Sequence, residues 1–298
     1  MVKEVKKEQD FNKIPSVWSV AGKEIWRDKV ALLGLILFIA TLGIAFIVGG
    51  MLDADYVQRI HVLNRDRAPG TGFGILGTDD GGRDMLRMLF LSTRNSLALA
   101  FIVTITTFTI GYTVGLFAGF YGGYTDMVIL RIIDFFVMVP TIMVIIVANV
   151  ALPVWNVPVF AAVLILMNWF TGARLLRART LQESAKDYVL ASKTLGTPNI
   201  AIIFKKILPN VVSIMLVNFI LGLANSIGLE TGLTVIGYGL PFGIPSIGRL
   251  IALARNPIVL QHRPWQWVPA VIVIVGVTLC IYAIGAAVRR AVNPRQRR

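Results

Sequence analysis

The chain has 298 residues, of which 56% are hydrophobic and only 15% are charged, and its mean hydropathy is +0.73. A soluble domain of this length carries more charge. The composition therefore excludes a soluble protein and predicts an integral membrane protein. The single cysteine, Cys280, excludes an intramolecular disulfide and a cysteine-cluster metal site.

The net charge of +13 would favour nucleic acid as a partner of a soluble protein, but the positions of the basic residues indicate another cause. Every lysine lies in residues 1–29 or in residues 174–206, whereas arginine and aspartate balance each other over residues 53–94. Cytoplasmic segments of membrane proteins are enriched in Lys and Arg. The asymmetry therefore places the two lysine-containing segments in the cytoplasm, and we expect no nucleic-acid partner.

Residues 1–29 are expected to form a cytoplasmic segment that starts as a disordered tail and continues as a short helix from about Ser16. Trp18 and Trp26, with lysines near them, favour a helix that lies in the membrane interface; an extended polar tail is the alternative. The apolar run from Val30 to Leu52 is long enough to cross a bilayer and too long for a signal core. We therefore expect an uncleaved first span.

An exterior loop is predicted over residues 53–94, where glycine is frequent. The loop ends in a polar cluster that includes Thr78, Asp79 and Asp84. We expect Thr78 or Asp79 to cap the helix that follows, because hydroxyl and acidic side chains favour helix N-termini. A cation site is the alternative.

The second span is predicted from about Ser96 to Phe120. Within it, Gly111, Gly115 and Gly119 follow one another at steps of four residues and therefore share one helix face. A ridge of small residues lets the backbone of a second helix approach closely. The spacing predicts a tight helix–helix contact along these glycines.

The third span is predicted from Met127 to Val150, with a kink at Pro140, which has no backbone N–H to donate. Arg131 and Asp134 are three residues apart on this helix, and we expect them to neutralise each other.

Three further spans complete a transmembrane domain over residues 30–290, at about 159–176, 208–229 and 267–288. Before the last of them, residues 232–264 form a second exterior segment, which we expect to dip partly back into the membrane against protein. Six crossings place both termini in the cytoplasm, together with the basic tail at 291–298.

Five polar side chains in or beside the predicted spans are costly in hydrocarbon and are candidates to line a translocation path. Hydrogen bonds between helices are an equally good explanation for them. They are Asn149, Asn168, Asn218, Asn225 and Glu230.

A polar, helix-forming loop over residues 177–206 separates the fourth and fifth spans. Apolar and small residues recur in it at helical spacing and predict one face of a short helix. Gly196 and Pro198 are expected to end this helix. A short amphipathic helix between two spans favours a docking partner, with a loop lying on lipid as the alternative. The predicted face consists of Leu181, Ala185, Tyr188, Ser192 and Leu195.

The order Ala191-Ser192, then Gly196, then Ile207-Leu208-Pro209 resembles the EAA loop of permease subunits of ATP-binding-cassette importers. In that family this loop forms the coupling helix, which inserts into a cleft of the ATPase subunit. Further motifs narrow the resemblance, which covers about residues 16–297, to the C-type subunit of oligopeptide and dipeptide permeases. These motifs are Leu76–Asp84, Arg94–Leu97, Gly119–Gly123, Asp126, Arg131, Asp134, Pro140, Gly237–Pro241, Pro245–Leu250 and Asn293–Arg295.

The resemblance implies an all-α polytopic fold of the type I importer permease kind, with six transmembrane helices and a cytoplasmic coupling helix. Leu190 stands where the family usually has Glu, and Lys206 stands where it often has an apolar residue. Packing is therefore a better expectation than a carboxylate–arginine pair for the contact with the ATPase. The residues that the resemblance assigns to this contact are Tyr188, Leu190, Ala191, Ser192, Lys193, Leu195 and Gly196.

The resemblance also implies a permease subunit, not an enzyme, that moves oligopeptides across the bacterial cytoplasmic membrane; residues 188–198 look like Gram-positive oligopeptide permeases. The implied partners are a second permease in a heterodimer, two cytoplasmic ATPase subunits, an extracellular peptide-binding protein and membrane lipid. The only Gly-Lys pair, Gly22-Lys23, lacks the rest of a Walker A motif. We expect no cofactor in this chain, with ATP and Mg bound by the ATPase subunits.

Two alternatives stay open at this point. One is a permease of the same family for dipeptides, nickel or another small solute. The other is a secondary transporter driven by an ion gradient, which would need titratable groups inside the membrane. Beyond the Arg131–Asp134 pair, only Glu230 is available for that role.

Overall fold

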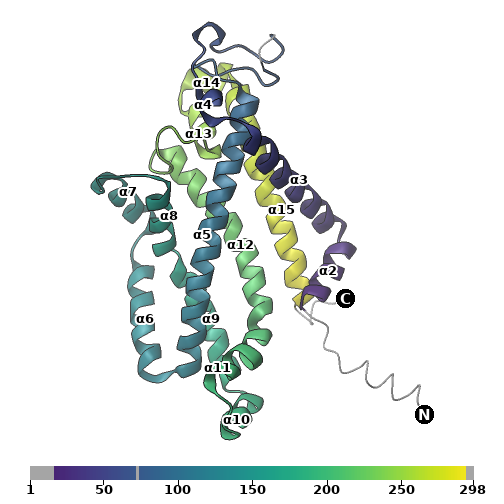
Figure 1. Cartoon of the computed structure of the whole chain (residues 1–298), viewed down its shortest axis with the longest axis vertical. Coiled ribbons are helices and arrows are strands. Elements are labelled where there is room, and N and C mark those ends of the chain that lie inside the picture. Colours follow the sequence, from purple (N-terminus) through teal and green to yellow (C-terminus); the bar gives the residue numbers. More distant parts are fainter. Residues whose placement is uncertain (1–16, 72–73, 293–298) are drawn as a thin grey trace, which may run out of the picture.

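The computed structural model describes residues 17–71 and 74–292, and within them the regular structure is helical apart from one isolated β-bridge between Thr78 and Asp84. Long helices lie side by side in a bundle (Figure 1). One end of the bundle carries the short helix α10 (Asp187–Thr194), and the opposite end carries α4 (Ala54–Gln58) and α14 (Pro257–His262). We call these the α10 end and the cap end.

In the described part of the chain, five helical segments are long and apolar enough to cross a membrane, and a bent helix pair makes up to six. The pair consists of α6 (Gly123–Met138) and α7 (Thr141–Ala151). The predicted all-α membrane fold is therefore confirmed. The five segments are α3 (Lys29–Met51), α5 (Met85–Tyr121), α8 with α9 (Val157–Leu166 and Trp169–Ser184), α11 to α12 (Asn199–Ile202 and Leu208–Ile236), and α15 (Val268–Val292).

The third span is more sharply broken than the kink expected at Pro140, because α6 and α7 are bent by 78°. Val139 is extended, with φ −85° and ψ 123°, since the ring of a following proline disfavours the helical region for the residue before it. Three other predicted bounds also shift. Helix α5 already begins at Met85, inside the range expected as an exterior loop, α9 continues to Ser184, and α12 continues to Ile236, past the end expected at about residue 229.

The N-terminal helix α2 (Val17–Arg27) packs against α15 and lies toward the α10 end (Figure 1). Asp28 follows it and caps α3, because its carboxylate accepts hydrogen bonds from the amides of Val30 and Ala31. The same carboxylate pairs with Arg290 near the end of α15. One acidic residue thus ties the start of the first span to the end of the last.

Helices α5 and α9 form the most extensive helix pair in the described structure, and the glycine ridge of α5 lies in their contact. A Cβ atom on Gly111 would lie 2.3 Å from the carbonyl oxygen of Trp169, and one on Gly115 would lie 2.5 Å from that of Ala173. At Gly119 the corresponding distance, to the carbonyl oxygen of Arg177, is 2.5 Å. Any side chain at these positions would therefore push the two backbones apart.

The cap end is held together by hydrogen bonds between segments that are far apart in the sequence. Thr78 is at the centre: its carbonyl oxygen accepts from Trp265 Nε1 at 3.2 Å and from Gln266 Nε2 at 3.0 Å. Nearby, Arg263 pairs with Asp66 at 2.6 Å. The short elements of this end are η1 (Val62–Asn64), α13 (Ile247–Ala252), η3 (Leu253–Arg255) and η4 (Pro264–Gln266), besides α4 and α14.

The expected helix cap at Thr78 or Asp79 is wrong, because Asp84 caps α5 by accepting from the amides of Leu86 and Arg87. Asp79 instead accepts from the amides of Gly81 and Arg83 and so closes a turn before the helix. Burial raises the pKa of Asp79, while the Arg83 amide and guanidinium oppose that change. Within the described ranges no group of three or more His, Cys, Asp or Glu side chains could hold a metal ion.

Candidate functional site

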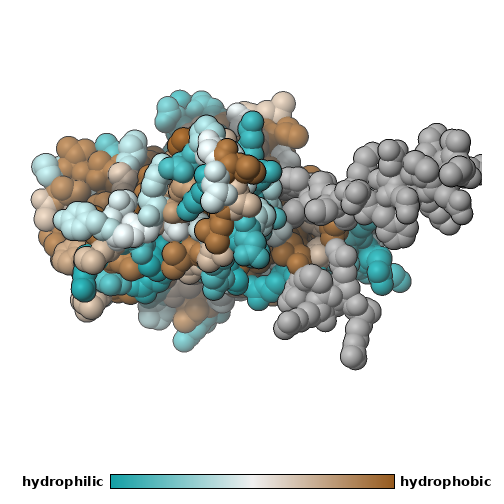
Figure 2. Space-filling model, turned by 90° about the horizontal axis from the view of Figure 1, so that it is seen from below, coloured by the Kyte–Doolittle hydropathy of each residue, from teal (hydrophilic) through white to brown (hydrophobic). Residues whose placement is uncertain are grey.

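The short helix α10 projects from the end of the bundle and is joined to two spans at once (Figure 1). Helix α9 leads into it after a break at Ala185 and Lys186, and α11 with the five-residue π-helix η2 (Ile203–Ile207) leads from it into α12. Figure 2 shows the molecule from below, where hydrophilic surface lies between hydrophobic side chains. A partner that moves α10 would therefore act on α9 and α12 together.

The C-terminus of α10 ends in the way that its Gly–Thr–Pro sequence predicts. Gly196 has φ +75°, a left-handed conformation that suits glycine. Its amide donates to the carbonyl of Lys193 at 3.0 Å, and the amide of Thr197 donates to that of Ser192 at 3.1 Å. These two bonds form a Schellman motif, which satisfies the last carbonyl groups of the helix.

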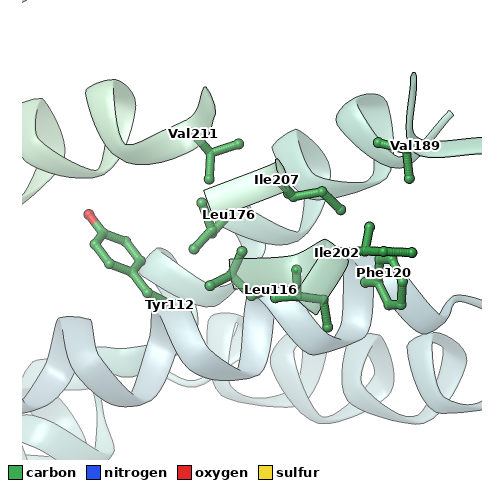
Figure 3. Close-up of a cluster of buried hydrophobic side chains, with 9 residues drawn as sticks. Tyr112, Leu116, Phe120, Leu176, Val189, Ile202, Ile207 and Val211 are labelled. Carbon is green, nitrogen blue, oxygen red and sulfur yellow. The ribbon is translucent and has the colours of Figure 1, made fainter. Parts of the chain in front are cut away.

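A cluster of buried hydrophobic side chains holds α10 against the bundle (Figure 3). Val189 is the only buried residue of α10, and its side chain is fully inaccessible. It packs in one cluster with residues of five other elements, α5, α9, α11, η2 and α12. Those shown with it include Phe120 of α5, Leu176 of α9, Ile202 of α11 and Ile207 of η2.

A polar contact beside this cluster ties α10 to both neighbouring spans. The Tyr188 hydroxyl donates to Glu183 Oε1 of α9 at 2.6 Å and accepts from Asn210 Nδ2 of α12 at 2.9 Å. Lys186 Nζ lies 2.7 Å from the other oxygen of Glu183. We call this set the Tyr188 latch. Burial and the Glu183 carboxylate raise the pKa of Tyr188 to about 12, so the hydroxyl keeps its proton at neutral pH.

The predicted apolar face from Leu181 to Leu195 is wrong as a single helix face. Helix α9 ends at Ser184 and α10 starts afresh at Asp187, so the helical phase does not continue across the break. As a result Val189, which the spacing did not select, is buried, whereas Leu195 is 84% exposed. Tyr188, Val189 and Leu190 are all apolar or aromatic, so the sequence carries no signal that singles out Val189 as the packed residue.

The remaining residues assigned to the docking helix lie mostly on its outer surface. Leu190 is 49% exposed, Ala191 and Lys193 are also exposed, and Ser192 is half-buried. The Lys193 ammonium lies 4.6 Å from the centre of the Phe120 ring, a distance at which a cation is attracted to the ring face. The helix thus offers exposed apolar and basic groups on a firmly attached support.

Two of the candidate path residues line cavities on the same side of α12. Asn218 lies in a cavity of about 720 Å³ at the α10 end, together with Arg179, Arg289 and Asn210. Asn225, two helical turns further along, lies in a cavity of about 520 Å³ with Gly228 and Tyr282 among others. A strip of amide and small side chains therefore runs along this face of α12.

The other three candidate residues are placed differently. Asn168 donates to the carbonyl of Leu164 in its own helix region, and Asn149 is half-buried on α7. Glu230 is completely buried and accepts from the hydroxyls of Thr231 at 3.3 Å and Thr234 at 3.0 Å. Both threonines belong to α12, the helix that carries Glu230, and the role of Glu230 in a path stays a prediction.

The expected pair between Arg131 and Asp134 is wrong, because Asp134 instead contacts Arg174 of α9 at 2.5 Å. A second ion pair joins the same two helices, from Arg177 to both carboxylate oxygens of Asp126. Arg174 and Arg177 of the neighbouring helix α9 therefore pair with the acidic residues of α6 in place of the local Arg131.

Comparison with known proteins finds that residues 111–298 match the family described as "Binding-protein-dependent transport system inner membrane component". The chain is 39% identical over 274 residues to the oligopeptide transport system permease protein OppC of Lactococcus lactis subsp. lactis, covering 92% of this chain and 93% of that protein. It is 30% identical over 284 residues to OppC of Bacillus subtilis, covering 95% and 91%. It is 29% identical over 293 residues to the dipeptide transport system permease protein DppC of Alkalihalophilus pseudofirmus, again covering 95% and 91%.

Proposed function

Because this chain belongs to the family of inner membrane components of binding-protein-dependent transport systems, we propose that it is the permease subunit of an ATP-driven importer for oligopeptides. The relatives named above, which share most of its length, are oligopeptide and dipeptide permeases. The identity of 39% to OppC of Lactococcus lactis subsp. lactis, against 29% to DppC of Alkalihalophilus pseudofirmus, favours oligopeptides over dipeptides as the substrate.

One observation carries the coupling part of this proposal: α10 is exposed on its outer side yet fastened to two spans. The buried Val189 and the Tyr188 latch connect α10 with α5, α9, α11 and α12. A partner subunit that closes on ATP and displaces α10 would tilt α9 and α12, and so open and close a path beside them. ATP and Mg would bind to that partner.

The membrane orientation follows from the same proposal. The lysines of residues 186–206 lie at the α10 end, as does α2, with Lys23 and the nearby Lys29. Basic residues favour the cytoplasmic side, so the α10 end faces the cytoplasm with both termini, and the cap end faces the exterior peptide-binding protein. The setting is a bacterial cell membrane, since all the relatives named above are bacterial.

The strip along α12 is the proposed contribution of this chain to the peptide path. Asn218 and Asn225 present amide groups, and Gly228 leaves room between them and the cap end. Amide side chains can donate to and accept from peptide backbones of any sequence. A path that accepts varied peptides needs such contacts to be few and weak. A second permease subunit would close the other side of the path.

Reconstitution tests the function directly. The chain is co-expressed with the second permease subunit and the ATPase subunits and purified as a complex. The complex is then placed in vesicles with the exterior binding protein. We expect uptake of a labelled tetrapeptide that requires ATP and is unaffected by a protonophore. Uptake that proceeds without ATP and collapses with the proton gradient would instead identify a secondary transporter. Competition by dipeptides or nickel separates the alternatives within the family.

A further inference from the structure

The outer face of α6 is apolar, exposed and interrupted by one arginine. Tyr124, Phe135 and Met138 share this face and are 79%, 63% and 82% exposed. Arg131 lies in the middle of them, at helical spacing from each. The opposite face of α6 carries Ile133, which is fully buried against α9.

Both acidic residues of α6 are occupied by arginines of α9. Asp126 is paired with Arg177, and Asp134 is paired with Arg174 at 2.5 Å. Arg131 is two residues from the buried Ile133, which places it about 200° further around the helix. Its side chain therefore points away from α9, and within the described residues it has no ion pair or hydrogen bond.

An unpaired arginine on an apolar, exposed helix face is costly in lipid. Arg131 lies about 12 Å along the helix from its first residue, Gly123, at the rise of an α-helix, and its neighbours on the face are apolar. Charged side chains inside membrane spans normally face protein or a water-filled cavity and pair with an opposite charge. The position therefore calls for a carboxylate from outside this chain.

A second copy of this chain would not supply that carboxylate. In the described spans every acidic side chain is already engaged: the two of α6 with arginines, Glu183 with Lys186, and Glu230 with threonine hydroxyls. We propose that the Tyr124–Met138 face of α6 is the surface that binds the second permease subunit, and that Arg131 pairs with a carboxylate in a span of that subunit. This inference rests on the proposed function, which supplies the second permease.

Photocrosslinking tests the surface in the intact complex. The photoreactive amino acid p-benzoylphenylalanine replaces Phe135, and in a control chain it replaces Leu33, which is similarly exposed on α3. We expect a covalent adduct with the second permease from position 135 and adducts with lipid alone from position 33. Lipid adducts alone from position 135, or a homodimer of this chain, would overturn the proposal.

Charge substitutions test the role of Arg131. We expect Arg131→Glu to lower the amount of co-purified second permease about tenfold or more, because like charges then meet in a desolvated interface, and Arg131→Lys to retain most of it. Membrane levels of each variant show whether the chain still inserts; if Arg131→Glu does not insert, Arg131→Gln replaces it and should weaken co-purification less. Replacing the partner carboxylate by a basic residue should restore assembly with Arg131→Glu. Wild-type co-purification with Arg131→Glu would refute the ion pair.

Peptide uptake by the wild-type complex is measured in parallel. A complex that assembles and crosslinks through α6 but moves no peptide would contradict the proposed substrate and support the interface. A complex that moves peptides normally with Arg131→Glu would contradict the interface and leave the substrate standing.

Discussion

The two ends of the bundle are stabilised by different interactions. At the cap end, polar bonds join residues that are far apart in the sequence, such as Gln266 to Thr78 and Arg263 to Asp66. At the α10 end, one small helix is fixed by a single buried valine and one tyrosine hydroxyl. The cap is therefore distributed over many contacts, whereas the attachment of α10 depends on few. A single substitution at the cap end should therefore have a small effect, whereas a single substitution in the attachment of α10 should have a large one.

Among these predictions, we expect the largest effect from Val189→Asp, which removes the buried apolar contact of α10. A carboxylate in the closed cluster of Phe120, Leu176 and Ile202 would lack a partner, at a cost of several kcal/mol. We expect α10 to detach, so that peptide uptake falls about tenfold or more, which corresponds to at least about 1.4 kcal/mol. The thermal unfolding of the remaining bundle should change little. The exposed Ile200 provides the control Ile200→Asp, and a variant at Val189 that transports normally would speak against the attachment.

Leu195→Asp tests the outer surface rather than the attachment. Leu195 is 84% exposed, so the substitution leaves the fold intact, while a charge on an apolar docking surface costs binding. We expect severalfold to tenfold weaker co-purification of the ATPase subunits, read by affinity capture, with unchanged membrane insertion. Undiminished capture together with full transport would mean that this residue does not contact the ATPase.

Gln266→Ala tests whether the stability of the cap end is shared among many contacts. Gln266 is buried and bonds both the Thr78 carbonyl and Asp66. The loss of these two hydrogen bonds should cost about 1–3 kcal/mol of unfolding free energy, while Trp265 and Arg263 still donate to the two acceptors. We expect a lower midpoint of thermal unfolding, with transport retained at low temperature. A loss of transport without a loss of stability would show that the cap also acts in the transport cycle.

Tyr188→Phe should give the smallest effect, about 1 kcal/mol, because the ring stays and only the hydroxyl bonds to Glu183 and Asn210 are lost. The pKa of Tyr188 is raised from 10.0 to about 12, so the neutral form is favoured in the folded state. The contribution is therefore fully present below pH 10 and is lost as pH rises toward 12. Stability measured against pH in the two proteins should differ by a constant below pH 10 and converge above it.

The sequence predicted best what depends on long runs of residues. The apolar stretch from Val30 to Leu52 gave the first span within one residue of α3, because a bilayer needs that length. The spacing of Gly111, Gly115 and Gly119 indicated a close helix contact, but which helix makes it, α9, came from the structure. Spacing shows which face is free of side chains and says nothing about the partner.

Short-range rules failed where another segment competed. Arg131 and Asp134 have the spacing of an ion pair, yet Arg174 takes the carboxylate. The docking helix was predicted from a continuous period, which the break after Ser184 shifts, so Val189 was missed. The two failures have different causes: in the first a residue distant in sequence takes the carboxylate, and in the second a local break between two helices resets the helical phase.

The glycine contact between α5 and α9 has a mechanical consequence. Where backbones touch, no flexible side chains lie between them to absorb a shift. Helix α5 has 37 residues and is about 55 Å long, so it reaches from beside α10 to Asp84 at the opposite end. A displacement of α9 would thus be transmitted by α5 to the cap end of the molecule. The close glycine contact therefore couples movement at the α10 end to the cap end of the bundle.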